Sequence, residues 1–368
     1  MRKILAVAAI AALALTGCGR ADDTTTGASG SASASVNPAD ITVGVAMPTK
    51  TSERWIKDGD YMKQQLEAAG YKVNLQYAND DIPTQVTQLQ DMITKKNDVL
   101  VVASIDGTAL KGALADAKAD GIPVIAYDRL LRDTDAVEYY TTFDNLKVGK
   151  QQAESLLAGL EASGKPKPWN VELFAGSPDD NNATFFYNGA WDVLKPKVDD
   201  GTIKIQSGET DFKTVATLRW DAAVAKKRME NLLTKSYSDK DVNGVLAPYD
   251  GLSRGIIAAL KGSGYGSGGK TLPVVTGQDA ELESVKSILA DEQYSSVFKN
   301  TQDLAKSTVA MIQEILDKKT VTVNDTTSYN NGVKVVPTQL LDPVSVDKSN
   351  IEQVLLDAKY YTADQLKS

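Results

Sequence analysis

Short apolar runs alternate along most of this chain with longer stretches in which apolar residues recur at helical spacing. In the first part of the chain the apolar runs predict strands at 41–47, 72–77, 99–103 and 123–127, with helices expected at 54–69, 84–96 and 108–119. Strands that alternate with helices predict βαβ units and a parallel sheet. The runs are almost wholly apolar, which is typical of strands that helices cover on both faces.

The same alternation restarts after a short predicted strand at 139–143. Further strands are expected near 170–175, 202–207, 244–247, 273–277 and 295–298, with helices between them. Two successive units of this kind predict an α/β protein with two lobes of similar architecture. Because ligands of parallel sheets bind beyond the carboxyl ends of the strands, two lobes whose strand ends face one another would form a ligand cleft.

The N-terminus follows a different pattern. Arg2 and Lys3 precede an unbroken apolar run at 4–15, which is the layout of a secretory signal and is too short for a membrane span of about 20 residues. Cys18, the only cysteine of the chain, follows in the sequence LTGC, which resembles the lipobox of bacterial lipoproteins, whose cysteine receives a diacylglyceryl group. A buried structural cysteine is the alternative. We expect a signal peptide at 1–17 and a lipidated Cys18, so the protein would be exported and anchored to the outer face of the cytoplasmic membrane.

Composition also changes sharply after the signal. Residues 19–38 are rich in Gly, Ser, Ala and Thr with almost no large apolar side chain, so they predict a flexible tether. The expected organisation is therefore a lipidated cysteine and linker, an N-terminal lobe and a C-terminal lobe. Their ranges are 18–38 for the linker, 39–143 plus 300–330 for the N-terminal lobe, and 144–299 plus 331–368 for the C-terminal lobe.

The composition of the chain narrows its function. Among its 368 residues there is no histidine, which excludes Ser-His-Asp and Cys-His catalysis and the usual His-rich zinc sites. The net charge of −8 disfavours nucleic acid as a partner, because an acidic surface repels phosphates. One cysteine alone cannot form an internal disulfide. We expect a monomer without catalytic residues, metal or cofactor, held to the membrane by the lipid anchor only.

Polar and aromatic side chains gather directly after the predicted strands. They include Arg54, Trp55, Asp128, Arg129, Asp180, Asn182, Asp279 and Lys299. A single Asp or Asn at such a junction often only caps a helix. Their recurrence at the same end of many strands, together with Arg, Lys and Trp, favours a binding site.

Sugars require this mixture of side chains. Each hydroxyl both donates and accepts, so planar Arg, Asp and Asn groups can bind neighbouring hydroxyls in pairs. The C–H faces of a pyranose are apolar and pack flat on aromatic rings. Trp55, which lies in a polar stretch and is expected to face the cleft, and Trp220 are candidates for such stacking, whereas Trp169 and Trp191 are expected to fill the core.

Several motifs resemble the periplasmic sugar-binding proteins of ABC importers. These are RW at 54–55, AYDR at 126–129, FDN at 143–145, GSPDDNN at 176–182 and GQDA at 277–280. The xylose-binding branch is recognisable throughout. A second set, SIDGT at 104–108, SG at 207–208, TLRWD at 217–221, PYDG at 248–251 and YNNGVK at 329–334, is closer still to the multiple-monosaccharide receptors of plant-associated bacteria, which also serve a virulence sensor kinase. The resemblance runs from about residue 43 to residue 366.

This resemblance implies a two-lobed, hinge-linked type I periplasmic-binding-protein fold that closes over its ligand. It also implies which residues bind sugar hydroxyls, with two indoles sandwiching the pyranose. Carried over by motif, the hydroxyl-binding residues are Arg54, Asp128, Arg129, Asp180, Asn182, Asp279 and Lys299, and the sandwich is Trp55 and Trp220. The implied hinge crossings lie near 143–144, 299–300 and 330–334. One position departs from the xylose-binding branch, which has Asn where this chain has Tyr249, so a preference for xylose does not follow.

The expected function is a receptor that captures an aldose of the xylose, glucose, galactose and arabinose class and delivers it to the membrane subunits of an ABC importer. A sugar receptor that docks on a membrane sensor kinase is an alternative. The enzyme alternative is a secreted glycosidase that uses two of Asp128, Asp180 and Asp279. Carboxylates bracketed by Arg and Lys stay ionised, which suits hydroxyl binding but not a general acid.

One motif points to a different ligand. Residues 264–271 match the phosphate-loop pattern of nucleotide-binding proteins letter for letter. That loop must follow a strand and open a helix, whereas this one follows a predicted helix and precedes a predicted strand. We therefore expect a flexible connecting loop here and no nucleotide site.

Overall fold

The computed structural model describes residues 37–367. The predicted signal peptide, Cys18 and most of the linker lie outside this range. No helix within it is long and apolar enough to cross a membrane.

The first sheet has six parallel strands in the order β11-β5-β4-β3-β1-β2. They are β1 (Thr42–Met47), β2 (Lys72–Tyr77), β3 (Val99–Val102), β4 (Val124–Tyr127), β5 (Val137–Phe143) and β11 (Thr338–Leu341). Four helices cover the two faces: α1 (Glu53–Ala68), α2 (Ile82–Thr94), α3 (Lys111–Ala119) and α10 (Thr301–Leu316).

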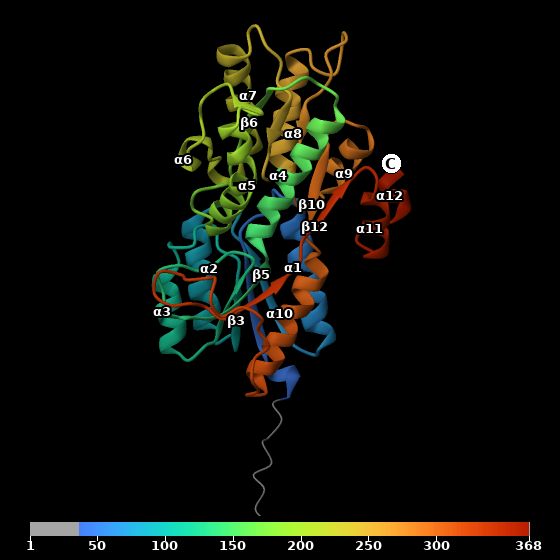
Figure 1. Cartoon of the computed structure of the whole chain (residues 1–368). Helices are drawn as coiled ribbons and strands as arrows, with labels where there is room; N and C mark the ends of the chain where they lie inside the picture. The colour runs from blue at the N-terminus through green and yellow to red at the C-terminus, as the bar shows by residue number, and fades with distance from the viewer. Residues whose placement is uncertain (1–36, 368) are drawn as a thin grey trace, which may run out of the picture. The chain divides into compact units, whose positions relative to one another are not determined.

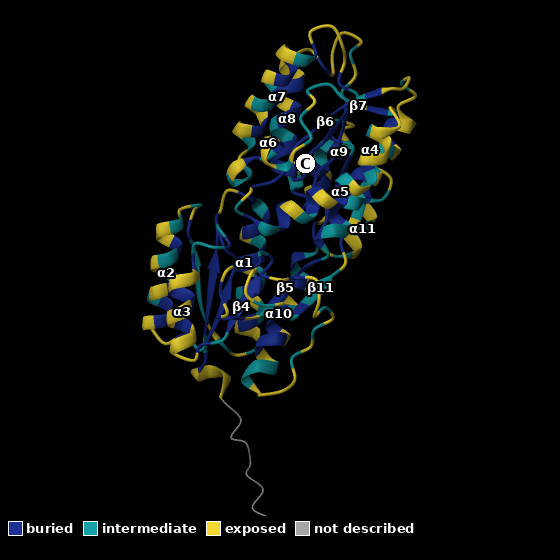
Figure 2. Cartoon of the chain, turned by 60° about the vertical axis from the view of Figure 1, so that its left-hand side comes forward, coloured by how far each residue is buried: buried dark blue, intermediate teal, exposed yellow. Residues whose placement is uncertain are grey.

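The apolar strands of this sheet bury both faces because successive side chains point to opposite sides. In β3, Leu100 packs toward the core beneath α2 and α3, while Val99 and Val101 pack toward the core beneath α1 and α10. Figure 2 shows the result, with the central strands buried between helices whose outer surfaces are exposed. The predicted parallel sheet covered on both faces is confirmed.

The second sheet has four parallel strands in the order β7-β6-β8-β9. They are β6 (Trp169–Leu173), β7 (Ile203–Ile205), β8 (Gly244–Leu246) and β9 (Val274–Val275). A two-stranded antiparallel ladder of β10 (Ser295–Phe298) and β12 (Val344–Asp347) adjoins it, because the Tyr294 amide donates to the Val275 carbonyl at 2.9 Å.

The elements around the second sheet are mostly helical. They are α4 (Asn145–Ala162), α5 (Asn181–Asp199), α6 (Phe212–Val215), α7 (Ala222–Ser236), α8 (Asp250–Gly262), α9 (Leu282–Leu289), α11 (Ile351–Asp357) and α12 (Ala363–Lys367), with short 3₁₀ turns η1 (Pro38–Asp40) and η2 (Leu218–Trp220). Helices α4 and α5 touch closely at Gly149, where an added Cβ would stand 1.9 Å from the Phe186 carbonyl oxygen. This contact places the beginnings of the two helices side by side, which matters for the site described below.

Three segments connect the two sheets: one between β5 and α4, one between β10 and α10, and one between β11 and β12. The first two lie where the crossings are expected, near 143–144 and 299–300. The third does not, because Thr338–Leu341 pairs with β5 in the first sheet, with Leu341 opposite Phe143. The chain therefore leaves the first sheet after Leu341, and the expected placement of 331–341 in the C-terminal lobe is wrong.

The reason for this error is local. Residues 330–335 form a tight turn that the Asn331 side chain ties to the first sheet, since its amide donates to the carbonyls of Leu131 and Thr134 at 3.1 and 2.7 Å. The strand that follows, TQLL, is short and half polar. Its pattern is too weak to be distinguished from a connecting segment.

The loop at 264–271 has the context expected of a connector. It follows α8 and precedes β9. Lys270 forms an ion pair with Asp241 at 2.8 Å and lies 3.9 Å from the centre of the Tyr265 ring. The geometry of a nucleotide loop, with a strand before and a helix after, does not occur here.

Candidate functional site

One cavity lies where the carboxyl ends of strands from both sheets meet. All nine residues predicted to bind sugar line it: Arg54, Trp55, Asp128, Arg129, Asp180, Asn182, Trp220, Asp279 and Lys299. The lining also contains eight residues outside that prediction: Thr49, Thr51, Ser52, Asp80, Phe186, Arg219, Tyr249 and Gln278. The position beyond the strand ends is the one expected for a ligand of parallel sheets.

Backbone geometry directs several of these side chains. Asp128 follows β4 directly and Asp279 follows β9, and both adopt left-handed backbone angles, with φ of 58° and 87°. Arg219 and Trp220 do so as well, with φ of 58° and 55°. Non-glycine residues in this region cost of order 1–3 kcal/mol each, and such strain concentrates at ligand sites. Four strained residues around one cavity therefore indicate a functional site.

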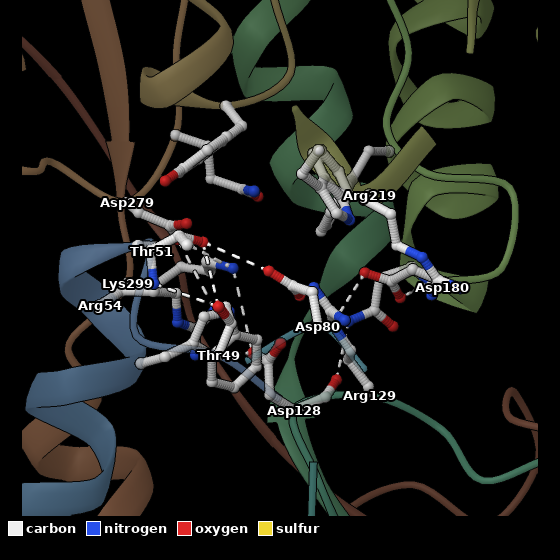
Figure 3. A pocket seen from close by; sticks show the side chains of 17 residues that line it. Thr49, Thr51, Arg54, Asp80, Asp128, Arg129, Asp180, Arg219, Asp279 and Lys299 are labelled. Atoms are coloured by element: carbon white, nitrogen blue, oxygen red, sulfur yellow. Dashed lines mark hydrogen bonds and ion pairs between the residues drawn. The ribbon is translucent and has the colours of Figure 1, made fainter. Parts of the chain in front are cut away.

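Arg54 is the centre of the charge network on one side of the cavity (Figure 3). Its Nη2 lies 3.0 Å from Asp128 Oδ2, and its Nη1 lies 3.7 Å from Asp279 Oδ1. Lys299 Nζ lies 3.0 Å from the same Asp279 oxygen and 3.9 Å from Asp128 Oδ2. Arg54 and Asp128 belong to the first lobe, whereas Asp279 belongs to the second, so the network crosses between them.

A residue that does not line the cavity holds Arg54 in place. Asp58, one turn further along α1, accepts a hydrogen bond from Arg54 Nε at 2.8 Å and another from the Tyr127 hydroxyl at 2.5 Å. Asp58 is fully buried. Burial raises its pKa to about 6, even though Arg54 opposes the shift. Sequence reasoning missed this residue, although its i, i+4 spacing from Arg54 on a helix was a usable signal.

A second set of contacts joins the lobes on the other side of the cavity. Arg129 Nε lies 3.1 Å from Asp180 Oδ2, and the Asn182 amide donates to the Asp128 backbone carbonyl at 2.7 Å. The Tyr140 hydroxyl donates to Asn182 Oδ1 at 3.0 Å. Asp180 and Asn182 stand at the start of α5, and the bond from Asn182 to Asp128 holds this helix start against the end of β4.

The electrostatic environment shifts the pKa values of the acids of the site in different directions. Burial alone would raise the pKa of Asp128, but the charges of Arg54, Lys299 and Arg129 lower it overall. Burial raises the pKa of Asp180, because Arg129 only partly offsets it. Burial would also lower the pKa of Arg54, yet Asp128, Asp58 and Asp279 raise it well above its usual value. Arg54 is therefore always charged, and Asp128 is an ionised hydrogen-bond acceptor at neutral pH.

Two indoles line the cavity. Trp55 is 4% exposed. The guanidinium groups of Arg54 and Arg129 lie over its ring, 4.4 and 5.0 Å from the ring centre, within the range of cation–π contacts. It also joins the core beneath α1, so it is more buried than its polar flanks suggest. Trp220 stands edge-on to Tyr249 and to Phe186, with ring centres 6.0 and 6.2 Å apart. It packs over Gly176, where an added Cβ would stand 2.0 Å from the indole.

Further polar atoms of the lining are available to a ligand. The indole nitrogen of Trp220 and Oε1 of Gln278 have no hydrogen-bond partner within residues 37–367. Burying such atoms unpaired is costly, so a ligand with hydroxyl groups would satisfy them. Arg219, missed by the sequence prediction, extends from the strained turn beside Trp220 and pairs with Asp179 at 2.7 Å. Its signal was its place in the TLRWD motif.

The described part of the chain contains no group of three or more Asp or Glu side chains that could hold a metal ion. What the cavity offers is charged and polar hydrogen-bonding groups beside flat aromatic surfaces. This is the chemistry of a polyhydroxylated ligand.

Comparisons with known proteins agree with this fold and cavity. Over 326 residues the chain is 57% identical to the multiple sugar-binding periplasmic receptor ChvE of Rhizobium radiobacter, covering 89% of this chain and 92% of that protein. It is 36% identical over 327 residues to the D-xylose-binding periplasmic protein of Escherichia coli, covering 89% and 93%. The crystal structure of an ABC transporter solute-binding protein from Clostridium phytofermentans with bound β-D-glucose matches with a TM-score of 0.84 and 45% identity, covering 88% and 99%.

The family comparison gives the same result. Residues 43–320 match the periplasmic binding protein domain, which spans most of both lobes. Together with the parallel sheets, the three crossings and the cavity between the strand ends, this match shows that the chain belongs to the periplasmic binding protein family.

Proposed function

We propose that this protein binds an aldose monosaccharide in the cavity and delivers it to an ABC importer. The observation that carries the proposal is the cavity itself, in which ionised acids, guanidinium groups and two indoles from both lobes surround one space. Similarity to a multiple sugar-binding receptor and to a glucose-bound solute-binding protein supports the choice of ligand class. Tyr249, where the xylose-binding branch has Asn, favours a ligand range broader than xylose.

In this proposal the cations and acids divide the sugar hydroxyls between them. Arg54, Arg129 and Lys299 donate to hydroxyl oxygens, while Asp128 and Asp279 accept from hydroxyl hydrogens. Trp55 and Trp220 provide surfaces for the C–H faces of the ring. Asn182 and Asp180 complete the set from the second lobe, which gives the sugar partners on both sides of the cavity.

Entry of the sugar requires the lobes to separate. Arg54, Asp128, Lys299 and Asp279 are only 2–6% exposed, so a sugar cannot reach them through the closed structure. The three crossings between the sheets are the proposed hinges. A ligand that bonds to both lobes favours the closed form through its differential affinity.

A binding role fits the cavity better than a hydrolytic one. A glycosidase needs a carboxylic acid with a raised pKa beside the bond that breaks. Arg54, Lys299 and Arg129 instead lower the pKa of Asp128. Burial raises the pKa of Asp180, but its carboxylate is held in an ion pair with Arg129 at 3.1 Å, which opposes that shift and suits an acceptor better than a proton donor. Membership of the solute-binding family supports the same conclusion.

Export and anchoring complete the proposal. The two relatives compared above, from Rhizobium radiobacter and Escherichia coli, are named as periplasmic proteins, which supports a place outside the cytoplasm. The lipobox at Cys18 and the polar linker after it are the basis for a lipid anchor, which would keep the receptor near its importer in a cell envelope with a single membrane.

Calorimetry tests the ligand class directly. Purified full-length protein is titrated with glucose, galactose, xylose, arabinose and glucuronate, alongside Arg129→Ala and Trp55→Ala. Arg228→Ala is the matched control, because Arg228 pairs with Glu209 away from the cavity. At least one aldose should bind the wild-type protein and the control, and both cavity variants should weaken that binding. No heat with any aldose, or unchanged binding in both cavity variants, contradicts the proposal.

A further inference from the structure

Helices α1 and α9 begin beside the same part of the cavity, one in each lobe. Ser52 is the N-cap residue of α1 and Glu281 is the N-cap residue of α9. Within the described chain neither side chain caps its own helix. Instead, the Ser52 hydroxyl donates to Glu281 Oε1 at 2.7 Å. A cap hydrogen bond normally stabilises a helix, so its replacement by a contact between the lobes calls for an explanation.

The neighbouring residues strengthen this contact. Glu53 Oε2 accepts the backbone N–H of Leu282, the first residue of α9, at 2.9 Å. An acid from the first lobe thus takes the capping role that Glu281 leaves open. The other oxygen of Glu53 accepts from the Tyr361 hydroxyl at 2.9 Å, so the C-terminal segment also joins this junction.

Glu281 also reaches the wall of the cavity. It is 3% exposed, and its Oε1 accepts from the Tyr249 hydroxyl at 2.7 Å. Its Oε2 pairs with Arg254 Nη2 at 2.6 Å, which balances the buried charge. Tyr249 lines the cavity and stands edge-on to Trp220. One carboxylate therefore links Ser52 of the first lobe, Tyr249 of the cavity wall and, through Tyr249, the indole of Trp220.

We propose that Glu281 is a positioning residue for sugar binding, which fixes Tyr249 in the cavity wall and ties that position to lobe closure through Ser52. The proposal rests on the sugar-binding function proposed above. Because the Tyr249 proton is committed to Glu281, the phenol oxygen is left to accept from a sugar hydroxyl. The Ser52–Glu281 bond exists only while the lobes are closed, so it adds to the apparent affinity by raising the closed population.

The chain supplies a matched control for this role. Glu172 is another buried carboxylate of the second lobe that accepts from a serine and a tyrosine, Ser207 Oγ at 2.6 Å and Tyr237 at 2.7 Å. All of these groups belong to the second lobe, and none of them lines the cavity. Loss of a buried acceptor costs stability at either site, but only Glu281 should alter sugar binding.

The experiment combines calorimetry with thermal unfolding on the full-length protein. The variants are Ser52→Ala, Glu281→Ala, their double mutant, Glu281→Gln and Glu172→Gln, with the aldose that binds the wild-type protein as ligand. Ser52→Ala should weaken binding about tenfold, because it removes one charge-assisted bond between the lobes. It should leave the ligand-free melting temperature unchanged, because that bond exists only while the lobes are closed. Glu281→Ala should weaken binding further, and Glu281→Gln should restore part of the loss. The double mutant should bind no more weakly than Glu281→Ala, since both changes break the same contact.

The outcomes separate the two proposals. Wild-type affinity in Ser52→Ala, additive losses in the double mutant, or an equal loss of affinity in Glu172→Gln overturns the positioning role while sugar binding itself stands. If Glu281→Ala does not fold, Ser52→Ala and Glu281→Gln still decide the question. Absence of aldose binding by the wild-type protein overturns the proposed function and the positioning role with it.

Discussion

Arg54 Nη2 lies 3.0 Å from Asp128 Oδ2, and both side chains are almost fully buried. The guanidinium group uses its remaining edges as well, since Nε bonds to Asp58 at 2.8 Å and Nη1 faces Asp279 at 3.7 Å. A planar fork with several donors can serve three carboxylates at once, whereas an ammonium group is a point charge. Arg54 thus orders the acids that the proposed sugar would contact.

Arg54→Lys should abolish most sugar binding although it keeps the positive charge. Lysine cannot bond to Asp58 and Asp128 at the same time. The two acids therefore lose their fixed positions, and their buried negative charge is less well balanced. Breaking one buried hydrogen-bonded charge pair typically costs about 2–5 kcal/mol of binding free energy. Calorimetry of the variant against the wild-type protein measures this loss, with Arg228→Lys as control because Arg228 contacts Glu209 outside the cavity. Equal affinity in Arg54→Lys and wild type would show that the fork is not needed.

Gly176→Ala should displace Trp220 and weaken sugar binding with little change to the rest of the fold. An added Cβ would stand 2.0 Å from the indole, so the ring has to move. We expect about a two- to tenfold loss of affinity, in line with an aromatic contact of about 0.5–1.5 kcal/mol beyond its buried area. Gly112→Ala is the control, since nothing lies within 4 Å of a Cβ added at this position of α3 and its stability should rise by about 0.5–1 kcal/mol. Tight binding by Gly176→Ala would place the sugar away from Trp220.

Residues directly after strands could be found from sequence because parallel strands place their carboxyl ends at one edge. Asp128 directly follows β4, while Asp180 and Asp279 lie on the segments that follow β6 and β9, and the cavity gathers all three. Position after a strand does not by itself identify every lining residue. Gln278 and Asp80 also follow strands, β9 and the edge strand β2, but only the meeting of the two lobes brings them to the same cavity.

The same limit applies to long-range contacts. No periodicity in the sequence connects Ser52 with Glu281, because the contact depends on how the lobes meet. Strand β11 was missed for a related reason. It follows the turn at Asn331, which local hydrogen bonds shape but which the bonds from the Asn331 amide to Leu131 and Thr134 fix against the first sheet.

The free energy of unfolding should fall as the pH rises from about 4 to about 8. Asp250 is fully buried, and burial together with the nearby Glu281 raises its pKa to about 8. Between its ordinary pKa and 8 the folded protein holds a proton that the unfolded chain releases, so the contribution of Asp250 to stability is full at low pH and is lost as the pH passes through 8. Asp58 adds a smaller slope of the same sign up to about pH 6.

Urea unfolding at pH 6 and pH 9 measures this dependence. The chain has no histidine, so no imidazole titration obscures the interval. Asp250→Asn should lose less stability between the two pH values than the wild-type protein. Asp342→Asn, at an exposed carboxylate, should behave like wild type. An identical slope in Asp250→Asn and wild type would assign the titration to another group.

Cys18→Ala should release the protein from the membrane without changing its affinity for sugar. The lipobox at 15–18 is the proposed site of the diacylglyceryl group, and removal of the sulfur removes the only attachment point for it. A single acyl chain binds a bilayer only weakly, whereas two chains on one residue give stable anchoring. Sugar affinity should be unaffected, because every residue that lines the cavity lies between Thr49 and Lys299. Fractionation of cells that produce wild type or variant, followed by calorimetry of both purified proteins, checks the two expectations separately. A variant that still sediments with membranes excludes Cys18 as the anchor, while altered sugar affinity would mean that the N-terminal segment contributes to the cavity.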